Sequence, residues 1–150
     1  MTLKTPSLVL ATAMLALAGC GGSSEPVVET AADDTGGASA QAGALDVPMG
    51  EWWIKPEPAE AEAGSIEFLA INEGKVVHEL EVIKTDTPAG DFPVKDGVAE
   101  VDGEEIGEVE DVAAGAEAPL KVDLDSGHYA LICNLPSHYE QGMHADFEVQ

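Results

Sequence analysis

Residues 133–143 of this chain read CNLPSHYEQGM, and the rest of the chain is best understood in relation to this stretch. It places a thiol at Cys133, an imidazole at His138 and a thioether at Met143, with the spacing Cys-x4-His-x4-Met. Soft sulfur donors and imidazole suit copper, and two His and one Cys with a weak axial Met are typical of blue-copper electron-transfer sites. Three of those four donors are present, so the rest of the chain must supply a second His and a rigid scaffold.

Short alternating runs bounded by Gly, Pro, Asn or Asp surround this stretch, and residues 45–150 carry no convincing helical period. This pattern predicts an all-β domain, an antiparallel β-sandwich of about 7–8 strands. Because side chains in a strand alternate between its two faces, parity predicts which of them enter the core. The predicted inward residues are Trp52 and Ile54; Ile66, Phe68 and Ala70; His78, Leu80 and Val82; Ala118, Leu120, Val122 and Leu124; Tyr129, Leu131 and Cys133; and Met143, Ala145, Phe147 and Val149.

The same parity selects a fourth donor. His78 points inward at the start of its run, Cys133 points inward at the end of a strand, and Met143 points inward at the start of the last strand. Pro136 restricts φ in the connecting turn, which stiffens the loop that returns His138 towards the thiol. We therefore predict that one copper ion is bound by His78, Cys133, His138 and Met143.

Each donor taken alone has a less specific interpretation. An inward His is more often a hydrogen-bonded core residue, a buried Cys can be a small hydrophobe, and Met143 can be core filler. The joint spacing favours a metal site. His128, His144 and Trp53 fall at outward parity, and we expect them on the surface.

The ligand set, the Asn-Glu-Gly that precedes the strand of His78, and the Gly127-x-Tyr129 that leads into Cys133 resemble the cupredoxins, the family of plastocyanin and azurin. The resemblance covers residues 51–150. It implies a Greek-key β-sandwich, a type 1 copper that cycles between Cu(I) and Cu(II), and one-electron transfer through the exposed edge of His138.

Two residues depart from the family pattern. Glu79 follows the first His, where Asn or Ser is common, and Ser137 precedes the second His, where Gly is frequent. The backbone N–H of Glu79 is still expected to donate to the Cys133 sulfur. Apolar residues that flank His138 are expected to form a small docking patch for a partner; they are Leu135, Pro136 and Tyr139.

The N-terminal part of the chain reads as an export signal and a tether. Lys4 precedes a short apolar run over residues 8–18, and Leu17-Ala18-Gly19-Cys20 resembles the lipobox of bacterial lipoproteins. This predicts a signal peptide over residues 1–19, lipid attachment at Cys20, and a flexible tether over residues 20–44 before the domain at 45–150. The alternative is ordinary signal cleavage that leaves Cys20 as a thiol. With Cys20 acylated, Cys133 has no disulfide partner, which favours a ligand role.

The charge of the chain limits its partners. There are 29 acidic residues against 6 Lys and Arg together, a formal net charge of −23. Such a surface repels nucleic acid and attracts a cationic redox partner, although acidity can also reflect a salty habitat. Many of the acids lie in residues 85–115, a long acidic segment that we interpret as a solvated excursion with a short strand near residues 106–112, the alternative being a recognition surface.

These observations predict a monomeric type 1 copper protein that carries single electrons outside the cytoplasm, at a bacterial cell surface or in the periplasm, on a lipid anchor. The alternative is an extracytoplasmic copper-handling module that buffers or delivers copper with the same residues. A copper enzyme needs an open coordination position or a second copper centre, and neither is evident in the sequence. We therefore expect no enzymatic activity.

Overall fold

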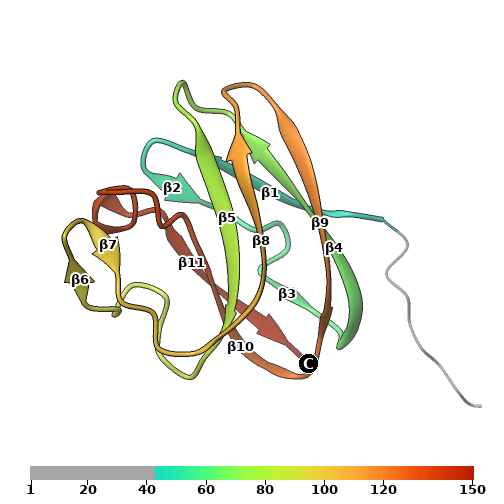
Figure 1. Ribbon diagram of the computed structural model, residues 1–150. Helices are drawn as coiled ribbons and strands as arrows, with labels where there is room; N and C mark the ends of the chain where they lie inside the picture. Colours follow the sequence, from blue (N-terminus) through green and yellow to red (C-terminus); the bar gives the residue numbers. More distant parts are fainter. Residues whose placement is uncertain (1–42) are drawn as a thin grey trace, which may run out of the picture. The chain divides into compact units, whose positions relative to one another are not determined.

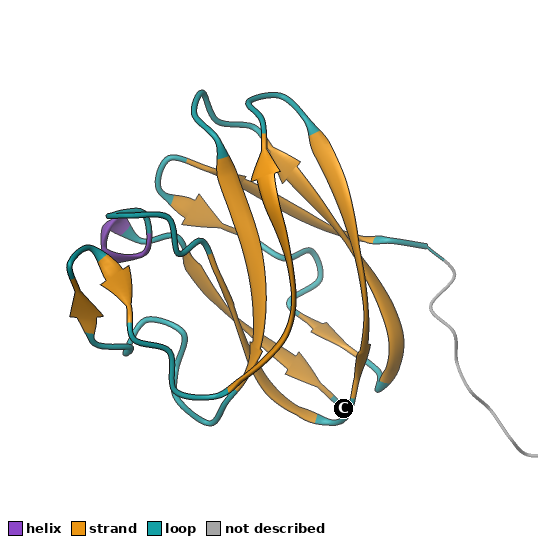
Figure 2. Ribbon diagram, in the orientation of Figure 1, coloured by secondary structure: helices purple, strands orange, loops and turns teal. Residues whose placement is uncertain are grey.

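The computed structural model describes residues 43–150, which form two facing β-sheets and a small hairpin (Figures 1 and 2). The predicted signal peptide, the lipid attachment at Cys20 and nearly all of the predicted tether lie outside the described residues. Within them, seven strands have six or more residues, consistent with the predicted Greek-key β-sandwich: β1 (Leu45–Gly50), β4 (Gly64–Asn72), β5 (His78–Lys84), β8 (Glu104–Val112), β9 (Glu117–Leu124), β10 (Gly127–Ile132) and β11 (His144–Val149).

Four further strands have two residues each, and one turn of 3-10 helix is present. They are β2 (Trp53–Ile54), β3 (Glu60–Ala61), β6 (Val94–Lys95), β7 (Val98–Ala99) and η1 (Tyr139–Gln141). The first sheet has the order β2-β1-β4-β9 and the second the order β3-β11-β10-β5-β8, while β6 pairs with β7 alone. The sheets are mixed rather than wholly antiparallel as predicted, because β1 runs parallel to β4 and β3 runs parallel to β11.

The main core fills the space between the two sheets and follows the predicted parity closely. On β4, the buried residues Ile66, Phe68 and Ala70 alternate with more exposed ones, and Phe147 of β11 meets Phe68 edge to face, with 5.2 Å between ring centroids. Aromatic pairs of this geometry stabilise a core beyond the area that they bury. This pair joins one sheet to the other.

A second apolar cluster covers the outer face of β10. Its buried members come from β5, β10, η1 and the segment that follows β5, and they are Ile83, Ala89, Phe92, Ala99, Ala130, Ile132 and Tyr139. The interpretation of this segment as a solvated excursion is therefore wrong for its first part, which buries apolar side chains against the sheet. The rest forms the nine-residue edge strand β8, longer than the predicted short strand.

Trp52 departs from the predicted parity. It is 38% exposed rather than buried, because Glu51 and Trp52 form the turn between β1 and β2, where strand alternation does not apply. Trp53 begins β2 and is half-buried, and the Lys55 ammonium lies 5.0 Å from the centre of its ring.

Candidate metal centre

The four predicted ligands come together at one end of the sandwich. His78 is the first residue of β5, Cys133 directly follows β10, and Met143 directly precedes β11. The register of β10 with β11 pairs Ile132 with His144, and the next pair is closed by a 3.0 Å hydrogen bond from the Cys133 N–H to the Met143 carbonyl. His138 lies in the connecting loop, and its carbonyl accepts from the Met143 N–H at 3.3 Å.

Three donor atoms face one another. The Nδ1 atoms of His78 and His138 are 3.2 Å apart, and the Cys133 Sγ lies 3.3 Å from Nδ1 of His138 and 4.0 Å from Nδ1 of His78. His78, Cys133 and Met143 are fully buried, while His138 is partly exposed. Two imidazoles, a thiol and a buried thioether form the donor set of a type 1 copper site, and their arrangement supports one such ion.

The ionisation of these groups fits a cation site. Burial lowers the pKa of His78, with His138 adding to the effect, and burial likewise lowers the pKa of His138, so both rings favour the neutral form that binds metal. Burial raises the pKa of the Cys133 thiol to about 11, against the opposing effect of the backbone amides of Glu79 and Leu135. Without a metal the thiol therefore keeps its proton, which a bound cation would displace.

Glu79 ties two ligand segments together. Its side chain is only 8% exposed, and its Oε1 accepts a 2.9 Å hydrogen bond from the backbone N–H of Asn134, the residue after Cys133. Glu79, which departs from the family pattern, thus links the start of β5 to residues 133–143, which we call the ligand loop. Sequence reasoning placed Glu79 on the outer face but did not identify this contact.

The segment after β5 braces the ligand loop from outside. The Asn134 amide makes two hydrogen bonds with the backbone of Ala99, at 2.7 and 3.3 Å, and the Ser137 N–H donates to the Gly97 carbonyl at 2.7 Å. Figure 1 shows the β6-β7 hairpin beside η1. Nothing in the sequence pattern of residues 85–115 indicated this role, because pairings between distant backbone groups leave no local periodicity.

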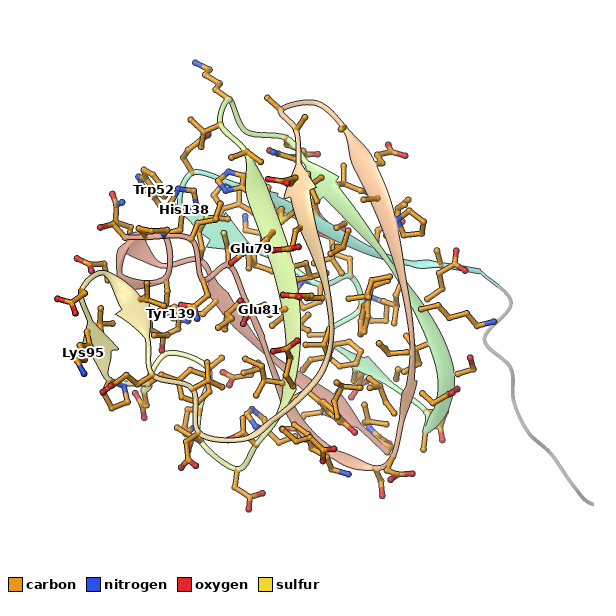
Figure 3. The ribbon with its side chains drawn as sticks, viewed as in Figure 1. Trp52, Glu79, Glu81, Lys95, His138 and Tyr139 are labelled. Atoms are coloured by element: carbon orange, nitrogen blue, oxygen red, sulfur yellow. The ribbon has the colours of Figure 1, made fainter. Side chains whose placement is uncertain are left out.

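Tyr139 is not part of a surface patch, and its prediction as a docking residue is corrected. It is 3% exposed, and its hydroxyl donates to the Ala89 carbonyl at 2.7 Å and accepts from the Phe92 N–H at 3.0 Å. Trp52, which was not predicted as a docking residue, lies beside His138 instead. The two rings meet edge to face, with 5.1 Å between their centroids (Figure 3). Leu135 is half-buried and Pro136 is exposed nearby in the chain.

His128 and His144 are not among the clustered donors of the described residues. Burial opposes protonation of His128, but hydrogen bonds to the Thr85 carbonyl at 2.7 Å and to Asp146 at 2.9 Å outweigh it and raise its pKa. His144 packs its ring against Tyr139 at 5.2 Å. Both side chains are partly exposed and serve the scaffold.

Glu81 makes the stability of the fold depend on pH. It lies opposite Glu108 of β8, and burial, followed by the charges of Glu79, Glu105 and Glu108, raises its pKa to about 8 (Figure 3). The folded protein therefore holds a proton that the unfolded chain has lost, so stability falls as pH rises from about 4.5 to 8. Glu81→Gln should reduce this slope, leaving the part due to Glu79, whose pKa burial also raises. It should stabilise the copper-free protein at pH 8 by about 1–2 kcal/mol after allowance for solvent screening.

Urea unfolding at several pH values checks this prediction. Glu117→Gln, at an exposed position of β9 on the other sheet, is the matched control and should leave the slope as in the unchanged protein. A parallel decline of stability in Glu81→Gln and in the unchanged protein would contradict the assignment.

Comparisons with known proteins agree with this architecture. No protein-family model matches the chain, and no curated protein matches it in sequence. Among solved structures it is similar to a dithionite-reduced auracyanin from Roseiflexus castenholzii, with 17% identity and a TM-score of 0.53 over 72% of this chain and 99% of that one. It is also similar to auracyanin B, with 15% identity and a TM-score of 0.53 over 71% and 88% of the two chains.

A third similar structure is auracyanin A, a blue copper protein from Chloroflexus aurantiacus, with 17% identity and a TM-score of 0.50 over 72% of this chain and 100% of that one.

The described residues contain no helix long and apolar enough to cross a membrane. The likeness to these three structures shows that the chain has the cupredoxin fold, the β-sandwich of blue copper proteins.

Proposed function

We propose that this chain is a one-electron carrier that holds one type 1 copper ion at His78, Cys133, His138 and Met143. The observation that carries the proposal is the convergence of two imidazole nitrogens and one sulfur, all within 4.8 Å of one another, at a strand-end site where only His138 reaches the surface. This set combines buried donors, which the surrounding protein holds in place, with the one exposed edge of the His138 ring. An electron carrier needs both.

Copper supplies the exchangeable electron when bound, and the chain's own residues keep the cost of the exchange small. Oxidised and reduced copper prefer different coordination geometries. A rigid ligand set with an intermediate geometry therefore keeps small the structural change that accompanies electron transfer. Rigidity here comes from the Glu79 contact to Asn134 and from the backbone bonds of Cys133 and Ser137. His138, partly exposed beside Trp52, is the route by which an electron enters and leaves.

Copper titration of the purified mature chain tests the proposal. We expect one Cu(II) per chain, an intense visible absorption from thiolate-to-copper charge transfer, and reversible one-electron reduction at an electrode. A colourless copper-loaded protein would overturn it. Slow loss of copper to a chelator is also expected, because the Cys and one His are buried; rapid loss would instead support the copper-handling module.

We further propose that a partner docks on the apolar residues around the exposed edge of His138, namely Trp52, Leu135 and Pro136. Leu135→Asp places a charge beside this edge, and it should slow electron transfer to a partner about tenfold, the cost of losing 1–2 kcal/mol of apolar contact, without changing the visible band. Stopped-flow mixing with an oxidised partner measures the rate. Ala63→Asp, in the β3–β4 turn at the opposite end of the strands, is the control.

An unchanged rate in Leu135→Asp would show that the partner approaches elsewhere. A changed visible band would mean that the substitution had disturbed the ligand loop, and the slower rate would then not report on docking.

The acidic surface supports a cationic partner. The chain carries 29 acids against 6 Lys and Arg together. Attraction between exposed charges is screened by salt, with a Debye length of about 10 Å at 0.1 M and about 3 Å at 1 M. The association rate with a cationic partner should therefore fall steeply over this range of ionic strength, and a rate that does not depend on salt would contradict electrostatic steering.

We also propose that the protein works as a monomer outside the cytoplasm, anchored through lipid on Cys20. The Leu-Ala-Gly-Cys sequence at residues 17–20 supports the lipid anchor and the export that it implies. Mass spectrometry of the mature N-terminus tests it, since a diacylated or triacylated Cys20 is expected and an unmodified one would contradict it.

A further inference from the structure

His78 has one ring nitrogen that the metal donors leave unused. Its Nδ1 faces His138 and Cys133, so its Nε2 points away from them. Among residues 43–150, this Nε2 is the one buried side-chain nitrogen or oxygen without a hydrogen-bond partner. A buried polar atom left unpaired costs free energy, so each instance calls for an explanation.

The nearest charged group is the carboxylate of Glu51, whose Oε1 lies 3.8 Å from this nitrogen. Glu51 belongs to the turn after β1, which is remote in sequence from His78. The same turn carries Trp52, whose ring meets His138. One short turn therefore contacts both imidazoles of the candidate metal centre.

The Glu51 carboxylate is held in place rather than free in solvent. Its Oε1 accepts backbone hydrogen bonds from Lys75 at 2.7 Å and from Val76 at 2.9 Å, and its side chain is 27% exposed. Gly74 packs so closely that a Cβ at that position would lie 2.8 Å from the carboxylate oxygens. The β4–β5 loop thus packs closely on this carboxylate, and a side chain at Gly74 would displace it.

We propose that Glu51 is the positioning residue of the copper site, and that its carboxylate closes from 3.8 Å to accept a hydrogen bond from the Nε2–H of His78 when the metal is bound. The inference rests on the proposed function. A neutral imidazole carries one proton on its ring nitrogens. A His ring that binds a metal through Nδ1 must therefore carry that proton on Nε2. Metal-binding His residues generally pass this second N–H to a carboxylate, carbonyl or water, which fixes the ring and raises its basicity.

The charge of the carboxylate has a direct consequence for the redox equilibrium. A fixed negative charge near the ligand set favours the higher positive charge of Cu(II) over that of Cu(I). Glu51 should therefore lower the reduction potential. The competing interpretation is that Glu51 only caps the β4–β5 loop through Lys75 and Val76.

Glu51→Gln separates these interpretations, because an amide oxygen can still accept from the loop while the charge is gone. We expect the ratio of Cu(II) to Cu(I) affinity to fall about tenfold, which for a one-electron couple is a rise in potential of about 59 mV. Glu73→Gln is the matched control: it removes the same charge from the same loop at an exposed side chain, and it should leave the potential nearly unchanged.

Glu51→Asp keeps the charge but shortens the side chain, so it tests the proposal even where the Gln variant perturbs folding. The charge interpretation expects Asp to keep a potential close to that of the unchanged protein. The loop-cap interpretation expects Asp, which is too short to accept from Lys75 and Val76, to change the potential, while Gln leaves it unchanged. In the diamagnetic Cu(I) protein, 15N NMR should also show the His78 proton on Nε2, exchanging with solvent faster in Glu51→Gln.

Equal potentials for Glu51→Gln and Glu73→Gln would overturn the inference, as would a His78 Nε2 proton whose exchange with solvent is no faster in Glu51→Gln. These failures differ from failure of the proposed function. If the protein is blue and reversibly reduced, but Glu51→Gln leaves its reduction potential unchanged, only the inference is contradicted. A colourless copper-loaded protein contradicts the proposed function.

Discussion

Replacement of Cys133 by Ser should abolish the intense visible absorption of the copper-loaded protein. That absorption requires a thiolate sulfur, and a hydroxyl in the same place gives neither the charge-transfer transition nor a comparable bond to copper. Loss of a group that hydrogen-bonds to a metal ligand typically lowers metal affinity about 10–100-fold. Loss of the ligand itself should therefore lower the affinity for Cu(II) by more than about 100-fold. Absorption spectra and a competition titration with a chelator measure both quantities.

Folding should survive this substitution. Cys133 is fully buried, but Ser has nearly the same volume and the backbone bond between Cys133 and Met143 does not involve the side chain. Ala130→Ser is the matched control, because it adds a hydroxyl at another fully buried position on β10 without touching a donor atom. It should reduce stability and keep the colour. A Cys133→Ser protein that stayed blue would exclude this sulfur as the ligand.

The donors could be identified from the sequence because each lies where a simple rule holds. His78, Cys133 and Met143 are at or next to strand ends, and the two-residue period of a strand predicts which face they occupy. His138 follows from local spacing within one loop. All four now lie at the same end of the sandwich, with His78, Cys133 and Met143 buried.

The predictions failed where no period applies. Trp52 lies in a turn, and Tyr139 lies in η1 within the ligand loop, so strand alternation could place neither side chain. Tyr139 is buried by Ala89 and Phe92, which come from a segment so rich in acids that its few apolar residues gave no periodic signal. The parallel pairing of β1 with β4 was also missed, since sequence patterns identify strands but not their partners.

Glu79 and Glu51 were missed as site residues for a further reason. Both are acids in an acidic chain, and composition alone cannot distinguish a carboxylate that accepts backbone N–H groups from one that is solvated. Only the fold brings Glu79 to Asn134, and Glu51 to Lys75, Val76 and His78.

Phe68→Ala should destabilise the fold more than any of the ligand or surface substitutions. Phe68 and Phe147 are both fully buried and join the two sheets, and truncation of a buried Phe typically costs about 3–5 kcal/mol because the cavity is only partly refilled. Domains of this size are stable by only about 5–15 kcal/mol, so the loss removes a large part of the total. Urea unfolding of the copper-free protein measures it, with the exposed Val94→Ala as a control that should cost about 0.5 kcal/mol or less.

The same variant tests whether the scaffold and the site are separable. Phe68 lies on β4, whereas His78 begins β5 and the other three candidate donors lie in the loop between β10 and β11. None of the four is on the strand that carries Phe68. The folded fraction of Phe68→Ala should therefore keep the position of the visible band while its unfolding midpoint falls. A shifted band would mean that the ligand geometry depends on the packing between the sheets, and a loss below about 1 kcal/mol would contradict the role of the aromatic pair in joining them.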